Sequence, residues 1–158
     1  MSVIIDGHNL LWAIQNAEEN ASITDITMCR ILDSYFCLTG LNGEIIFDGT
    51  GPPTKTEFNN IKNLLVTFSG RSRDCDTVIE HRILDSTAPK LLTIVSTDRR
   101  LRDAASARKA TAVKSEDFWD EIIKRISRQK PGKEPPGKRS GLTESETQLW
   151  LKTFGIDQ

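Results

Sequence analysis

The sequence is poor in the residues that mark several common classes of protein. It contains three cysteines and no C-x2-C pair, so neither a zinc cluster nor a secreted disulfide framework is favoured. His8 and His81 are too few and too separated for a strong triad signal. There is also no G-x-S-x-G or P-loop pattern, so nucleophilic serine or ATP chemistry is not expected.

Long apolar runs and a strong charge bias are also missing. No stretch approaches the roughly 18 apolar residues of a membrane span, and the N-terminus does not read as a signal peptide, so we expect a cytoplasmic protein. The net charge of -1 does not by itself indicate a nucleic-acid partner. A chain of 158 residues can bury a sufficient core as one domain without disulfides or a structural metal.

The sequence does contain short apolar runs separated by segments with helical spacing. The central runs are continuous rather than alternating, which is typical of strands buried on both faces. We therefore predict an α/β fold with helices on both sides of a mostly parallel sheet. The predicted strands are 3–5, 44–47, 65–68, 91–96 and 111–113.

Two of the intervening helices have recognisable starts. Thr24 or Asp25 can cap the first of them, which has a mixed apolar stripe. Ser115 begins the other, with acidic residues in its first turn. This helix is expected to turn four apolar side chains toward the core, namely Phe118, Ile122, Ile123 and Ile126.

The composition changes near the C-terminus. Residues 1–127 form the predicted α/β domain, and 128–141 are rich in Pro, Gly and basic residues, which is typical of a linker. Residues 142–158 are predicted to form a helical tail, because Thr143 and Glu146 have the spacing of a capping box.

Three aspartates follow separate predicted strands of the sheet: Asp6, Asp76 and Asp98. Parallel strands bring their carboxyl ends to one edge, where ligands usually bind. Each aspartate alone could be a helix cap. Carboxylates about 4 Å apart repel by roughly 4 kcal/mol at an effective dielectric near 20, so a cluster needs a cation. Oxygen ligands of this kind favour Mg²⁺ or Mn²⁺.

Two further residues belong to this candidate site. Glu80 lies one helical turn after Asp76 and can add a fourth carboxylate. Asn9 lies in the helix after Asp6, where it can donate to a phosphate, orient a ligand or cap the helix.

The ordered motifs resemble those of one family. They are DGHN at 6–9, FDG at 47–49, DCDTVIE at 74–80 and STDR at 96–99. The sequence over residues 2–127 is similar to the YacP-like branch of NYN domains, within the PIN-like ribonucleases. This resemblance implies a Rossmann-like three-layer sandwich and a metal-dependent RNA endonuclease centre at Asp6, Asn9, Asp76 and Asp98.

The chain departs from the family pattern at Thr77. Many relatives carry two consecutive acids where this chain has Asp76 and Thr77. The resemblance then implies that one outer metal contact is missing or is supplied by Glu80, Asp74 or Asp103. Asp103 is off the ideal i+4 position relative to Asp98, so we expect it to support the ligands rather than bind the ion.

Five arginines flank the proposed site in sequence: Arg71, Arg73, Arg99, Arg100 and Arg102. Guanidinium groups bind phosphates through paired donors, although each arginine alone could be a solvated surface charge. Trp12, Trp119 and Trp150 lie in apolar helical patterns, so we expect core packing rather than base stacking.

Three functions fit these observations. The first is a Mg²⁺- or Mn²⁺-dependent endoribonuclease acting on single-stranded or ribosome-associated RNA. The second is a catalytically inactive RNA-binding or ribosome-associated adaptor, which the threonine at position 77 favours. The third, a metal-dependent phosphatase, would more naturally show a D-x-D pair, which is absent at residues 6–8.

Overall fold

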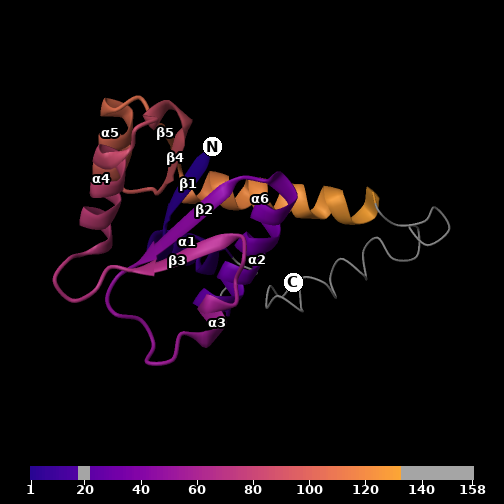
Figure 1. Ribbon diagram of the computed structural model, residues 1–158. Helices are drawn as coiled ribbons and strands as arrows, with labels where there is room; N and C mark the ends of the chain where they lie inside the picture. The colour runs from indigo at the N-terminus through magenta and orange to yellow at the C-terminus, as the bar shows by residue number, and fades with distance from the viewer. Residues whose placement is uncertain (18–21, 133–158) are drawn as a thin grey trace.

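The chain forms three layers, a central parallel sheet between two layers of helices (Figure 1). The computed structural model describes residues 1–17 and 22–132. The sheet has five strands in the order β3-β2-β1-β4-β5, and every neighbouring pair is parallel. The strands are β1 (Ser2–Asp6), β2 (Asn42–Phe47), β3 (Leu64–Phe68), β4 (Leu92–Val95) and β5 (Thr111–Val113).

Helices connect these strands on both faces of the sheet. They are α1 (Gly7–Gln15), α2 (Asp25–Thr39), α3 (Thr56–Asn59), α4 (Cys75–Asp85), α5 (Arg99–Ala107) and α6 (Ser115–Gly132), with a short 3₁₀ turn η1 at Pro89–Leu91. The predicted α/β architecture with a mostly parallel sheet is therefore confirmed.

Alternate side chains of the central strand enter two separate cores. Val3 and Ile5 pack with the apolar faces of α1, α2 and α6, whereas Ile4 packs with α4 and α5. Figure 1 shows α4 and α5 together on one side of the sheet. Because β1 lies mid-sheet and is covered on both faces, its residues must be continuously apolar, as the sequence is.

The helices α2 and α6 begin where the sequence predicts. The Thr24 hydroxyl caps α2 by accepting a hydrogen bond from the Thr27 amide at 3.3 Å. Phe118, Ile122 and Ile126 of α6 are buried. The helix continues to Gly132, past residue 127, and the predicted tail 142–158 lies outside the described residues.

The tryptophan predictions have different outcomes. Trp119 is buried in the core beside α1 and α2, as predicted. The prediction for Trp12 is wrong, because 63% of this residue is exposed. The apolar stripe of α1 is instead formed by its neighbours Leu10 and Ile14, which are fully buried. Trp150 lies outside the described residues.

The topology creates a crevice at the carboxyl ends of β1 and β4. The chain leaves β1 toward α1 and α2 on one face, but leaves β4 toward α5 on the other. In open α/β sheets, this change of direction between neighbouring strands is where ligands bind. Within the described part of the chain, no helix combines the length and apolar character needed to cross a membrane.

Candidate metal centre

Asp6 ends β1 and lies in this crevice with only 6% of its surface exposed. The following Gly7 starts α1 directly against β2. A Cβ atom at Gly7 would lie 2.6 Å from the Phe47 ring and 2.9 Å from the Ile46 carbonyl oxygen. Only glycine allows so close an approach, so the position of the Asp6 carboxylate follows from backbone packing.

Asp76 reaches the same crevice from the first turn of α4. The Asp74 side chain caps this helix by accepting from the Thr77 amide at 2.7 Å. Asp48, at the end of β2, accepts from the Cys75 amide at 2.5 Å. These two contacts fix the start of α4, so that donor atoms of Asp6, Cys75 and Asp76 all lie within 4.8 Å of one another.

Asp98 completes the group from the loop after β4. The buried Ser96 hydroxyl donates to Asp6 Oδ2 at 3.1 Å and accepts from the Asp98 amide at 3.0 Å. The Asp98 side chain also caps α5 by accepting from the Arg100 amide at 2.9 Å. Its carboxyl group lies close enough to Asp76 to help raise the pKa of that aspartate.

The electrostatics of the group are unfavourable for negative charge. Burial, the hydrogen bond to Asp98 and the charges of Asp6 and Asp98 together raise the pKa of Asp76 to about 7. Burial also raises the pKa of Asp6 above its usual range. Both shifts mean that the site disfavours the charged form of these two carboxyl groups.

Arg100 is the cation nearest to this group. Its guanidinium makes two bonds to Glu80, at 3.0 and 2.5 Å, and approaches Asp76 Oδ2 at 4.0 Å. The side-chain hydrogen bond from Arg100 holds the pKa of Glu80 below its usual range. Glu80 is therefore engaged by Arg100 in this structure rather than turned to Asp6.

Asn9 connects three parts of the fold beside the carboxylates. Its Oδ1 atom accepts from the Thr97 amide at 2.9 Å, the Thr97 hydroxyl at 2.6 Å and the Ser115 hydroxyl at 2.5 Å. Three donors saturate this oxygen, so only the NH₂ group of Asn9 remains for a ligand.

The other predicted residues lie around this centre. Thr77 is half-buried, and its amide is bound by the cap Asp74. Asp103 is exposed and lies 3.8 Å from Arg99, so its nearest charged partner is that arginine rather than Asp98.

The remaining arginines differ in exposure. Arg71 and Arg73 are exposed in the segment before α4, where an Arg73 nitrogen lies 3.4 Å from His81 Nδ1. The Arg99 side chain is 94% exposed. Arg102 is half-buried, and among the described residues its Nε atom has no hydrogen-bond partner.

Sequence reasoning missed three residues of the site: Asp48, Cys75 and Ser96. Asp48 entered the sequence analysis only as part of the FDG motif at 47–49, and in the structure it holds the start of α4. The Cys75 thiol lies 3.6 Å from Asp6 Oδ1. A polar residue directly after each buried strand was the available signal for Asp48 and Ser96. No sequence signal gives the direction of the Cys75 thiol.

The donor set fits a hard divalent cation. Asp6, Asp76 and Asp98 provide carboxylate oxygens, and the raised pKa values of Asp6 and Asp76 show that the site disfavours their negative charge without one. The neutral thiol of Cys75 is a donor to oxygen here, and burial raises its pKa well above the usual range. The residues present therefore fit a bound Mg²⁺ or Mn²⁺.

The parallel α/β sheet with acidic residues at one edge is a PIN-like nuclease fold. The family model of the YacP-like NYN domain matches residues 3–150, and this chain belongs to that family. Two similar solved structures are those of Rae1 (YacP) from Bacillus subtilis and its tryptophan-to-leucine variant.

The likeness to these structures concerns the fold. Rae1 is 16% identical over 98% of this chain and 95% of its own, with a TM-score of 0.63. The variant is 18% identical over 84% of this chain and 82% of its own, with a TM-score of 0.61. No curated protein matches the sequence.

The raised pKa of Asp76 predicts a pH dependence of stability. The native state holds a proton on Asp76 up to about pH 7, whereas the unfolded chain releases it near pH 4. The free energy of unfolding should therefore fall as pH rises from about 4 to 7, because the native state binds more protons in this window. Asp76→Asn should reduce this slope in metal-free urea titrations.

The matched control is Asp120→Asn, which changes an exposed aspartate on α6. It should keep the pH slope of the parent protein. If Asp76→Asn has the same slope as the parent, the aspartate is not the group that titrates.

Proposed function

We propose that this chain is a divalent-metal-dependent endoribonuclease that hydrolyses phosphodiester bonds of single-stranded or ribosome-associated RNA. The observation that carries this proposal is the approach of Asp6 and Asp76, whose carboxylates lie with the Cys75 thiol within 4.8 Å of one another in a PIN-like nuclease fold. Asp98 lies beside Asp76 and is joined to Asp6 through the Ser96 hydroxyl. The geometry is open to solvent on the side of Asp76, whose side chain is 28% exposed.

Asp6, Asp76 and Asp98 would hold the ion, with Mg²⁺ or Mn²⁺ as the candidates. When bound, such an ion supplies charge for the phosphoryl oxygens and makes water a better nucleophile at neutral pH. Glu80 can join these ligands only if Arg100 leaves it, since both of its oxygens accept from this arginine.

The chain's own residues would position the RNA. The NH₂ group of Asn9 can donate to a phosphoryl oxygen, because its carbonyl oxygen is already saturated. Ser96 orients Asp6 through a 3.1 Å hydrogen bond. The exposed guanidinium groups of Arg73 and Arg99 can bind the flanking phosphates.

An RNA-binding adaptor without catalytic activity is the second candidate. Thr77 stands where the family resemblance implies an acid, and Glu80 is paired with Arg100, so of the four predicted carboxylate ligands Asp6, Asp76 and Asp98 remain for an ion. Such a protein would bind RNA but would not cleave it when Mn²⁺ is added.

The endonuclease proposal predicts that RNA cleavage requires a divalent ion and Asp98. EDTA should abolish cleavage, and Asp98→Asn should lower the rate by at least roughly 100-fold, because a neutral amide cannot supply the charge that holds the ion. Gel assays with a labelled single-stranded RNA measure both effects. Asp120→Asn is the control and should cleave like the parent, whereas cleavage that persists in EDTA and in Asp98→Asn would rule out the metal-centred mechanism.

The proposed phosphate contacts predict a change in salt dependence. Arg73→Ala and Arg99→Ala should each weaken RNA binding and lower the slope of log K against log salt by about 0.7–1. Fluorescence anisotropy at several salt concentrations measures this slope. Arg30→Ala removes an exposed arginine of α2 and should keep the parent slope. An unchanged slope in all three variants would make Arg73 and Arg99 ordinary surface charges.

A further inference from the structure

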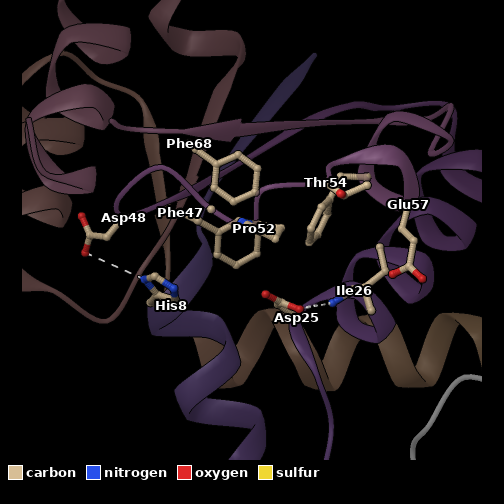
Figure 2. Close-up of a pocket in the computed structure, with 11 residues that line it drawn as sticks. His8, Asp25, Ile26, Phe47, Asp48, Pro52, Thr54, Glu57 and Phe68 are labelled. Atoms are coloured by element: carbon tan, nitrogen blue, oxygen red, sulfur yellow. Dashed lines mark hydrogen bonds and ion pairs between the residues drawn. The ribbon is translucent and has the colours of Figure 1, made fainter. Parts of the chain in front are cut away.

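A cavity of about 590 Å³ opens beside the acidic crevice, between the start of α1, the start of α2, α3 and the loop after β2. Figure 2 shows His8 and Asp48 at one end of this cavity, Phe47, Phe68 and Pro52 in the middle, and Glu57 at the other end. The cavity has no role in the metal centre described above.

The cavity and the metal centre share a wall. His8 lies two residues after Asp6, at the start of α1. Asp48 lines the cavity with one side and holds the Cys75 amide with Oδ1, and its Oδ2 lies 3.9 Å from His8 Nδ1. An RNA chain with a phosphate on an ion held by Asp6 and Asp76 would therefore place a neighbouring base at the mouth of the cavity.

The middle of the cavity is aromatic. Phe47 and Phe68 are stacked with centroids 5.8 Å apart, and Phe58 meets the Phe68 ring edge-on at 5.5 Å. The imidazole of His8, whose side chain is 52% exposed, meets Phe47 at 5.3 Å. Phe47 and Phe58 are buried, so the imidazole of His8 is the ring on which an unstacked RNA base can stack, with hydrogen bonds then recognising the edge of the base.

Aromatic rings beside acids can also bind a cation, but the chain already supplies one. Lys55 Nζ lies 5.4 Å from the centroid of Phe68 and donates to the Pro52 carbonyl oxygen at 3.0 Å. Because this internal ammonium occupies the ring face, the cavity is better suited to a neutral flat ligand than to a second cation.

The polar groups of the cavity determine which hydrogen-bonding groups the ligand must present. Asp25, Asp48 and Glu57 are carboxylates, which only accept hydrogen bonds when ionised and which repel phosphate. Asp25 uses Oδ1 for the Ile26 amide at 2.7 Å. Glu57 is exposed and makes no side-chain hydrogen bond or ion pair to the described residues. The ligand must therefore present donors and no negative charge, and among the bases guanine has two adjacent donors, N1–H and N2–H₂.

We propose that this cavity binds a guanine base of the RNA, with Asp25 and Glu57 accepting from its donor edge and the exposed imidazole of His8 covering its ring. The proposal rests on the proposed function, because it concerns the base next to the phosphate at the metal centre. It makes the cavity a specificity site for the position that is cleaved.

Nucleosides test the cavity without the metal centre, since they carry no phosphate. Guanosine, inosine, adenosine, cytidine and uridine are titrated into ¹⁵N-labelled protein in EDTA, followed by amide shifts around Gly51 and Phe58. Guanosine should bind roughly tenfold more tightly than inosine, which lacks the 2-amino group, and shift amides that line the cavity. The double variant Asp25→Asn, Glu57→Gln should weaken guanosine binding by roughly tenfold or more, and Asp120→Asn should not.

Three results would overturn the guanine site: no nucleoside binding, equal affinity for all five, or parent-like affinity in the double variant. Tighter binding of N-acetyl-arginine amide than of guanosine at the same amides would also overturn it, in favour of a basic peptide. The amide spectrum of the double variant reports whether it is folded. Mn²⁺-dependent cleavage is measured separately, so cleavage without guanosine binding removes only the cavity proposal, and guanosine binding without cleavage supports the cavity but removes the endonuclease.

Discussion

Repulsion among Asp6, Asp76 and Asp98 is the constraint around which this edge of the sheet is organised. Buried like charges are costly at short range, so each carboxylate must be held in place by its own contacts. The Ser96 hydroxyl holds Asp6, and the caps at Asp74 and Asp98 hold the helices that carry the other two. Arg100 offsets part of the charge from 4.0 Å. The remaining charge is what a divalent ion would neutralise.

The sequence predicts the fold well because strands that are buried on both faces of the sheet are continuously apolar. The continuous apolar runs correspond to β1, β2, β3 and β4, with bounds that differ by one or two residues. Asp6 and Asp98 are predictable for a related reason, since Asp6 ends β1, Asp98 lies in the loop after β4, and the carboxyl ends of parallel strands share one edge. Asp76 lies in the first turn of α4 rather than at the end of a strand. Neither inference needs knowledge of a specific tertiary contact.

The contacts that tune the site could not be predicted in this way. The pairing of Arg100 with Glu80 joins α5 to α4, and the bond of Asp48 to the Cys75 amide joins residues 27 positions apart. Trp12 shows the same limit, because its periodicity fits a buried stripe but the sheet accepts only Leu10 and Ile14. Long-range partners depend on how helices sit on the sheet, which local patterns do not specify.

The most direct test of the central claim is the melting temperature of the parent, Asp76→Asn and Asp76→Ala with and without Mn²⁺. An ion that binds only the native state stabilises it by about 2.7 kcal/mol at 100 times its dissociation constant. The account predicts a clear rise in the parent and in Asp120→Asn, and a much smaller rise in both Asp76 variants. Equal shifts in all four proteins would contradict a metal centre built on these carboxylates.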